Sequence, residues 1–329
     1  MTKENGCTCG QTPCTCGAKS AKGADAGHGE KAGEIVLRAG TRGSRLAMAQ
    51  TKRVCGMLEK LGIKTEIVII KTIGDDRTNV PMHQVGGQGI FVRALDDAII
   101  NGEVDFAVHS MKDIPAKRPE GVVTCAVLKR DSPCDYLVHN CPLEDVKVIG
   151  TSSTRRKAQL LRGGLNPTIK ELRGNVDTRL KKLNAGDYDA IVLAEAGMQR
   201  LEMELPGTQL MPQWYVPSPN QGIIAVVCRD DKELAAMFAP LNDETTARDS
   251  LYERIVMEEI GGGCFTPQGI FCENGFMIAE VLSLDGKVQQ RIEDNVSSVE
   301  DAHAIGRKLK VIAADLIEDA RRKLGIRTF

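Results

Sequence analysis

The sequence predicts an α/β protein with two successive α/β domains and a smaller α+β domain at its C-terminal end. From residue 35 onward, apolar segments of strand length alternate with amphipathic segments of helix length, which is typical of a mostly parallel sheet with helices on its faces. The alternation restarts after Pro133 and changes character beyond residue 241. The length of 329 residues agrees with this division, because domains commonly have roughly 100–200 residues.

The first unit opens with an apolar strand and an amphipathic helix that ends at Gly62. In that helix, apolar residues recur every third or fourth position from Leu46 to Leu61. An alternating strand, a second helix and a strand that runs into a polar loop follow. The expected elements are a strand at 35–39, a helix at 46–61, a strand at 64–74, a helix at 89–103 and a strand at 104–113.

The second unit repeats the order strand, loop, helix, at 146–163, 169–186 and 188–203. An apolar strand at 222–229 follows it. After residue 241 come an acidic helix at 245–260, a loop with Cys264, short strands and a final helix at 299–323. The predicted domains are residues 34–130 together with 222–240, residues 131–221, and residues 241–329.

Residues 1–33 form a tail rich in Cys, Gly, Ala and Lys, which has too few large apolar residues to fold alone and is expected to be disordered. Its Cys-x-Cys units, Cys7/Cys9 and Cys14/Cys16, could bind a soft metal such as zinc or copper(I). Their spacing differs from the usual C-x₂-C zinc motif, so incidental thiols are the alternative, and the role of the tail stays open.

The composition and the apolar pattern argue against nucleic-acid and membrane partners. With 43 basic and 44 acidic residues, the net charge of −1 argues against general nucleic-acid binding. The sequence shows neither an apolar run of about 18 residues, the length of a membrane helix, nor a signal peptide. We therefore expect a cytoplasmic protein without a membrane partner, with reduced thiols, and a monomer because no strongly apolar surface helix is evident.

Polar residues, and arginines above all, follow the predicted strands. Ligands of open α/β sheets bind at the carboxyl ends of strands, where helix N-termini attract anions. A single arginine there is usually a solvated surface charge, but several in successive loops predict a cleft for a polyanion, because guanidinium groups bind carboxylates and phosphates. The loops are 41–44, 109–113, 150–156 and 172–179, and the arginines are Arg42, Arg155, Arg156, Arg173, Arg179 and Arg200.

The loop at 109–113 places Lys112 beside Asp113 directly after an apolar strand. An aspartate among cations stays ionised and can stabilise a developing positive charge or move a proton. A helix cap or a structural ion pair is the alternative. His109, at the end of the same strand, is expected to be a hydrogen-bonded structural group. The segment GGQGIF at 86–91 lacks the spacing of a phosphate-binding loop, and we interpret it as a mobile lid.

Cys264 follows three glycines and precedes a Thr-Pro turn. Glycines permit tight turns and the close approach of a ligand. A thiol nucleophile normally needs a base, and no histidine lies near Cys264 in the sequence. A buried cysteine that behaves as a small apolar residue is the alternative.

Eight motifs then occur in a fixed order over about residues 35–329: GTRGS, GGQGIFV, DFAVHSMKD, GTSSTRR, LRGNVDTRL, YDAIVLAEAG, PSPNQG and GGGC. In this combination the sequence resembles the porphobilinogen deaminase family, also called hydroxymethylbilane synthases. HSMKD and LRGNVDTRL are the most specific of these motifs, and the tail at 1–33 is outside the resemblance.

The resemblance implies two domains like those of periplasmic binding proteins and a third domain that carries the cysteine. It implies a transferase that joins four porphobilinogens head to tail into linear hydroxymethylbilane, with release of ammonia, for tetrapyrrole and haem biosynthesis. A dipyrromethane cofactor made from substrate would be held by a thioether to Cys264. The electrophile would be an activated azafulvene, so the sulfur would need no base, and no metal is expected in the site.

Residue roles follow by matching motifs. Asp113 and Lys112 would be catalytic, and Asp113 would accept pyrrole N–H bonds and stabilise positive charge. The acetate and propionate groups of the pyrrole rings would bind to the arginines. The cofactor-binding set would be Arg42, Ser44, Ser153, Arg155, Arg156, Arg173 and Arg179 with Cys264, and the substrate-binding set Arg200 and Gln221.

Two positions depart from the family pattern, because Gln88 stands where many members have Lys and Ile73 where some have Arg. Both changes remove positive charge near the predicted lid and leave its contacts open. Two other functions stay possible from the residues alone. One is a binding module for an anionic ligand, and the other is a thiol-dependent acyl transferase that uses Cys264.

Overall fold

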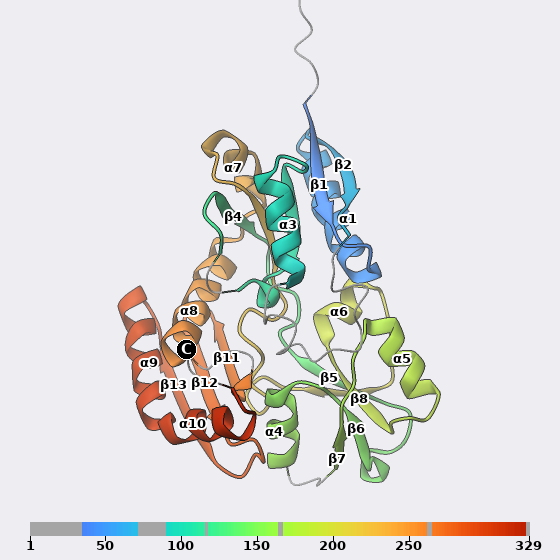
Figure 1. Cartoon of the computed structure of the whole chain (residues 1–329), viewed down its shortest axis with the longest axis vertical. Helices are drawn as coiled ribbons and strands as arrows, with labels where there is room; N and C mark the ends of the chain where they lie inside the picture. Colours follow the sequence, from blue (N-terminus) through green and yellow to red (C-terminus); the bar gives the residue numbers. More distant parts are fainter. Residues whose placement is uncertain (1–34, 72–89, 116–117, 164–166, 262–264, 327–329) are drawn as a thin grey trace, which may run out of the picture. The chain divides into compact units, whose positions relative to one another are not determined.

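The computed structural model describes residues 35–71, 90–115, 118–163, 167–261 and 265–326. Two five-stranded sheets and one three-stranded sheet confirm the predicted α/β class with a smaller α+β part (Figure 1). The predictions for the tail at 1–33, for Ile73 and Gln88 and for Cys264 lie outside the described residues.

The first sheet has the strand order β2-β1-β3-β10-β4. β1 is parallel to β2 and β3, whereas β10 is antiparallel to β3 and β4. Four of the five strands, β1, β2, β3 and β4, therefore run in one direction, which confirms the expectation of a mostly parallel sheet, and β10, which comes from a later part of the chain, runs against them. The strands are β1 (Val36–Thr41), β2 (Lys64–Ile69), β3 (Phe106–Ser110), β4 (Val122–Val127) and β10 (Ile224–Arg229).

Helices pack on both faces of this sheet. Alternate residues of β3 point to opposite faces, so Phe106 and Val108 lie on one face and Ala107 on the other. α1 (Arg45–Lys60) and α7 (Lys232–Phe238) cover the Phe106 face, and α3 (Ile90–Ile100) covers the Ala107 face, here called the α3 face. The sequence had indicated α1 and α3 but not α7, which is only seven residues long.

The second sheet repeats this plan with the order β7-β6-β8-β5-β9. Here β5 is antiparallel to β8 and β9, and β6 is parallel to β7 and β8. The strands are β5 (Asp135–His139), β6 (Val148–Gly150), β7 (Thr168–Lys170), β8 (Ala190–Ala194) and β9 (Gly207–Leu210). The helices are α4 (Thr154–Arg162), α5 (Val176–Asn184) and α6 (Glu195–Arg200).

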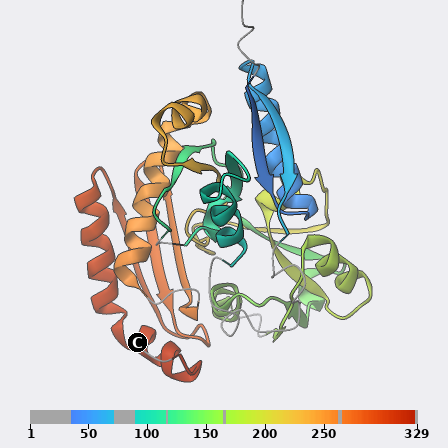
Figure 2. The same cartoon turned by 45° about the horizontal axis from the view of Figure 1, so that its top comes forward.

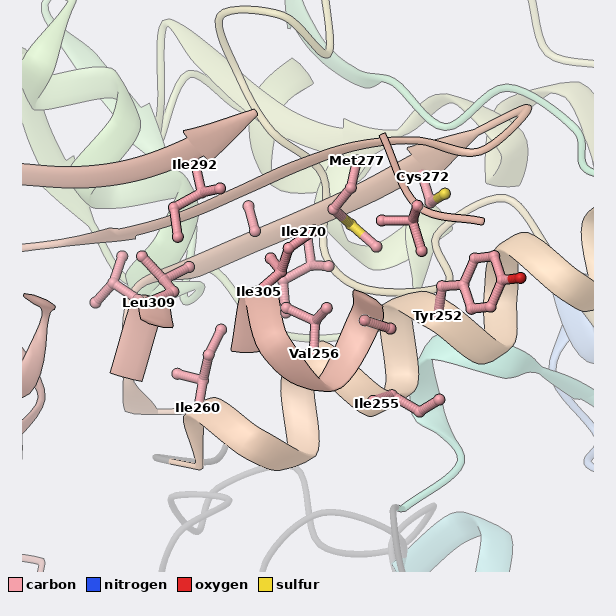
Figure 3. Packing of buried hydrophobic residues seen from close by; sticks show 14 of the residues in the cluster. Tyr252, Ile255, Val256, Ile260, Ile270, Cys272, Met277, Ile292, Ile305 and Leu309 are labelled. Atoms are coloured by element: carbon pink, nitrogen blue, oxygen red, sulfur yellow. The ribbon is translucent and has the colours of Figure 1, made fainter. Parts of the chain in front are cut away.

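The third sheet is antiparallel and packs against two helices, α8 (Glu244–Ile260) and α9 (Val299–Ile312), which lie side by side in both cartoon views (Figure 2). Its strands are β11 (Gln268–Glu273), β12 (Phe276–Leu282) and β13 (Gln289–Asn295). Figure 3 shows the core between them, to which α8 contributes Val256 and Ile260, α9 contributes Leu309, and the sheet contributes Ile270 and Met277.

The predicted helix at 299–323 is two helices, α9 and α10 (Ala314–Lys323). They meet at Ala313, whose backbone angles (φ −104, ψ 10) leave the helical range. Ala313 is fully buried, and Leu309 before it and Ile317 after it belong to the same core. The break lets both helices keep an apolar face on that core, and no sequence signal such as proline or glycine marks it. The described residues also form three short 3₁₀ helices: η1 (Met111–Asp113), η2 (Leu143–Asp145) and η3 (Ala239–Leu241).

Two buried glutamates tie the third sheet to the rest of the body. Glu253 of α8 binds Arg130 Nη2 at 2.7 Å and accepts the backbone N–H groups of Asn220 and Cys272. Glu280 of β12 accepts hydrogen bonds from Gln159 and Arg162 of α4. Such charged groups are buried without large cost only when they are fully paired.

None of the helices in the described ranges is long and apolar enough to cross a lipid bilayer.

Candidate functional site

Three helices that follow strands of the two larger sheets, α1, α4 and α5, begin at capped N-termini. Ser44 caps α1 by accepting the N–H of Ala47, and Ser153 caps α4 by accepting the N–H of Arg156. Asn175 caps α5 in the same way through Thr178. Extended backbone at the cap and a side-chain oxygen are the local reasons why these helices begin there. Three of the four predicted polar loops, 41–44, 150–156 and 172–179, therefore lie at N-termini of α-helices, where anions are favoured.

The HSMKD loop turns sharply after β3 into η1. The N–H of Met111 donates to the carbonyl of Ile223 at 3.0 Å and fixes the turn. This leaves Asp113 exposed at the carboxyl end of β3, while Lys112 is partly buried. The Nζ of Lys112 donates to Oε1 of Gln221 at 3.2 Å.

Asp135, at the start of β5, is the centre of a buried charge network. Its carboxylate accepts from Nη1 of Arg155 at 2.8 Å and from Nη2 and Nε of Arg156 at 2.6 and 3.1 Å. It also accepts from Nε2 of Gln221 at 2.9 Å, and Gln221 in turn accepts from Lys112. The chain Asp135–Gln221–Lys112 thus leads from the second sheet to the HSMKD loop.

Burial and the charges of this network shift the pKa values of Asp135 and Lys112. Burial alone would raise the pKa of Asp135, but the charges of Arg155 and Arg156 outweigh burial and hold that pKa well below its usual range. Burial lowers the pKa of Lys112 to about 8, with the carboxylates of Asp113 and Asp135 opposing this shift and the two arginines adding to it. Lys112 therefore changes charge close to physiological pH.

Among the predicted anion-binding arginines, Arg155, Arg156 and Arg200 are buried and bind carboxylates and carbonyls of the protein itself. Arg155 also donates to the carbonyl of Val216, and Arg156 to that of Val192. Arg200, whose side chain is almost wholly buried, donates to Asp131 Oδ2 at 2.8 Å and to the carbonyl of Gly222 at 2.7 Å.

Arg173 and Arg179 of the LRGNVDTR loop are half-buried, and so is Arg42, which follows β1. Arg179 donates through Nε to the carbonyl of Gly174, and Arg173 forms an ion pair with the exposed Glu171. Burial, and then the charge of Arg156, lower the pKa of Arg179 to about 10. The donors in these loops are cationic and partly accessible, which fits a ligand that carries several carboxylates.

The motifs singled out Lys112, Asp113, Gln221 and the arginines, and the structure brings Lys112, Gln221, Arg155 and Arg156 together around Asp135. Sequence reasoning missed Asp135. The available signal was an acidic residue at the start of an apolar strand. Two adjacent arginines, Arg155 and Arg156, follow it in the sequence and need a counter-charge if they are buried.

We predict that Asp135→Asn lowers the free energy of unfolding by about 3–5 kcal/mol, because it leaves two buried guanidinium groups without a counter-charge. Urea unfolding at pH 7 measures this, and Asp187→Asn, on an exposed loop, is the matched control. Since the pKa of Asp135 is lowered by folding, its stabilisation is present above its unfolded value and is lost as the pH falls below about 3.9. The difference between wild type and variant should therefore shrink in acid. A variant as stable as wild type at pH 7 contradicts the role given to Asp135.

Comparison with known proteins agrees with the geometry. Residues 37–236 match the sequence model of a family described as "Porphobilinogen deaminase, dipyromethane cofactor binding domain". A probable porphobilinogen deaminase of Methanosarcina acetivorans is 47% identical over 82% of this chain and 90% of its own length. One of Methanocella arvoryzae is 44% identical over 88% of this chain and 99% of its own, and one of Archaeoglobus fulgidus 45% identical over 84% and 98%.

Among solved structures, a periplasmic molybdate-binding protein of Azotobacter vinelandii covers 61% of this chain and 89% of its own at 17% identity, with a TM-score of 0.35, a likeness too distant to carry an argument. The sequence matches, by contrast, span most of the chain and of the relatives. The chain belongs to the porphobilinogen deaminase family, a family of transferases with a dipyrromethane cofactor-binding domain.

Proposed function

We propose that the protein is a hydroxymethylbilane synthase, which joins four porphobilinogens head to tail with release of ammonia. The observation that carries this proposal is the position of Asp113. It is an exposed carboxylate at the carboxyl end of β3, next to a lysine whose ammonium group is held by the Gln221–Asp135 network. Family membership and the cationic loops around it support the same reaction.

The residues of the site fit a polycarboxylate cofactor. Arg42, Arg173 and Arg179 offer guanidinium groups, and the hydroxyl groups of Ser44 and Ser153 stand at helix N-termini. Cys264 is proposed to hold the dipyrromethane through a thioether. When bound, the cofactor supplies the pyrrole carbon to which the first substrate is joined.

Asp113 is proposed as the catalytic carboxylate. It accepts pyrrole N–H bonds and stabilises the positive charge that develops on the ring when the C–N bond of porphobilinogen breaks. Its exposure leaves it free to contact substrate, whereas Asp135 is already saturated with donors. Lys112, held beside Asp113, binds a substrate carboxylate through its ammonium group.

Arg155 and Arg156 act on the cofactor carboxylates through their charge, and Asp135 fixes their positions. Arg200 and Gln221 are proposed to bind the incoming substrate. Their present partners include the carboxylates of Asp131 and Asp135, so a substrate carboxylate offers them the same chemistry. The domain boundaries at 130/131, 221/222 and 240/241, the monomeric state and the cytoplasmic location stay predictions from the sequence.

Intact-mass measurement of the purified protein tests the proposed function. We expect an added mass of two pyrrole units on wild type, and none on Cys264→Ser or Cys264→Ala. Incubation with porphobilinogen should then release ammonia and yield hydroxymethylbilane. A binding module would show no added mass and no product, and an acyl transferase would show a thioester mass that hydroxylamine removes. Either result contradicts the proposal.

Replacement of Asp113 tests its role in the reaction separately from any role in folding. Asp113→Ala should reduce kcat by at least about a hundredfold, since it removes a preorganised charge from the site, and leave the folded structure intact because Asp113 is exposed. Single-turnover assays with porphobilinogen and far-UV circular dichroism measure the two effects. The exposed Asp187→Ala serves as control. Near-normal hydroxymethylbilane formation by Asp113→Ala would refute the assignment.

The pKa of Lys112, lowered mainly by burial to about 8, predicts the alkaline limb of the pH profile. The ammonium group is charged below that pKa, so kcat/KM for porphobilinogen should fall as the pH rises through about 8. Lys112→Arg keeps its charge at all these pH values and should move the limb upward by more than about one pH unit. Lys157→Arg, exposed on α4, is the control and should leave the limb in place. An unchanged limb in Lys112→Arg would assign it to another group.

A further inference from the structure

A tight turn at residues 218–222 leads the chain from the second sheet back to β10. The N–H of Gln221 donates to the carbonyl of Ser218 at 3.0 Å. Asn220 and Gly222 have positive φ angles of 62° and 88°, in the left-handed region that favours glycine. A side chain on Gly222 would meet two backbone carbonyl oxygens of the other connection between the two sheets at 2.8 Å. The turn therefore needs glycine at 222, whereas Asn220 holds a left-handed conformation with a side chain in place.

This turn contacts the HSMKD loop at two points. Oε1 of Gln221 accepts from Nζ of Lys112 at 3.2 Å. The carbonyl of Ile223, directly after the turn, accepts the N–H of Met111 at 3.0 Å, and the N–H of Ile223 donates to the carbonyl of Asn220 at 3.3 Å. The conformation of the turn therefore sets where its two partners in the HSMKD loop lie.

The left-handed conformation of Asn220 is held through its backbone N–H. Asn220 is 1% exposed, and its Oδ1 is buried without a hydrogen-bond donor in the part of the chain that the structure describes. Its N–H donates to Oε2 of Glu253, a fully buried residue of α8. Oε1 of Glu253 binds Nη2 of Arg130 at 2.7 Å and the N–H of Cys272 at 2.8 Å. Two other partners thus fix the carboxylate that holds the turn.

α8 holds a second left-handed asparagine in the same way. Asn274 has a φ angle of 53°, and its N–H donates to Oδ2 of Asp249 at 2.6 Å. Asp249 is buried and lies four residues before Glu253 on α8. The turn of Asn274 joins β11 to β12 within the third sheet, so this pair has the same chemistry without a place in the candidate site.

We propose that Glu253 is a positioning residue of the candidate site. By accepting the N–H of Asn220 it fixes the turn, and the turn fixes the HSMKD loop through Gln221 and the carbonyl that follows. This rests on the proposed function, because Lys112 and Asp113 of that loop are assigned to the reaction there. Glu253 acts through these neighbours and needs no contact with substrate or cofactor.

A purely structural role for Glu253, as the partner of Arg130 between α8 and the rest of the body, predicts a different result. Loss of that pair would lower stability whatever residue stands at position 220. The two roles can be separated at Asn220, because glycine adopts a left-handed conformation without steric cost, whereas alanine does not.

The first test replaces Asn220 and leaves the pair of Arg130 and Glu253 in place. Asn220→Ala should lower kcat with porphobilinogen by at least about tenfold, because small displacements of reacting groups slow a reaction strongly. Asn220→Gly should keep the wild-type kcat. Asn274→Ala, the matched control, should lower the thermal midpoint of unfolding as Asn220→Ala does and leave kcat unchanged.

The second test replaces the acid itself. Glu253→Gln should also lower kcat by at least about tenfold, for the same reason. Asn220→Gly in the Glu253→Gln protein should restore kcat, because glycine forms the turn without a charged acceptor for its N–H. A purely structural role predicts no such rescue. If Glu253→Gln does not fold, the two replacements of Asn220 decide the matter alone.

Hydrogen exchange of the full chain gives a readout that needs no substrate. Peptides that cover residues 110–113 report the N–H of Met111, which donates to the carbonyl after the turn. Its exchange should be faster by at least about tenfold in Asn220→Ala and in Glu253→Gln, because the contact opens locally. Asn274→Ala and Asn220→Gly should exchange like wild type.

Wild-type kcat and exchange in Asn220→Ala or in Glu253→Gln would overturn the proposal. So would a Glu253→Gln protein that Asn220→Gly does not rescue, since Glu253 would then be a structural tie only. Failure of the proposed function looks different, because it shows as missing added mass and missing hydroxymethylbilane in wild type, while the exchange measurement still decides the positioning role.

Discussion

The carboxylate of Asp135 is the contact on which the candidate site depends. It is fully buried, it has two guanidinium groups and one amide as donors, and it connects through Gln221 to the lysine next to Asp113. Such a group stabilises the fold only when all its hydrogen-bond and ion-pair partners are present. A buried charge with all its partners is tolerated, whereas one that lacks a partner lowers the stability of the folded state. The same carboxylate therefore holds α4 against β5 and, through Gln221, contacts the lysine of the HSMKD loop.

Other buried acids repeat this arrangement at the junctions of the body. Glu253 joins α8 to Arg130 and β11, and Glu280 joins β12 to α4. In each case an arginine or amide from one segment meets a carboxylate from another that lies far away in the sequence. At these junctions positive charge thus meets negative charge, whereas Arg173 and Arg179 lie in partly accessible loops.

The sequence predicts local features such as helices and strands well. It predicts poorly which strands and side chains from distant parts of the chain contact each other. Helix 46–61 and the strand ending in HSMKD could be predicted because their periodicity and capping residues are local. The direction of β10 and the partners of Arg155 could not be, because both depend on contacts between segments far apart in the chain. Asp135 and Glu253 escaped notice for the same reason: a single charged residue shows nothing of its burial until its partner is placed.

The antiparallel strand β10 has a consequence for how the chain is built up during synthesis. β3 and β4 are neighbours only through β10, so their facing edges have nothing to pair with until residue 229 has been made. The whole second sheet is synthesised in between, and its two connections run together, with the N–H of Asp131 donating to the carbonyl of Gly222 at 3.0 Å. The second sheet is therefore an insertion in the first. It can form its own core before β10 is made and pairs with β3 and β4.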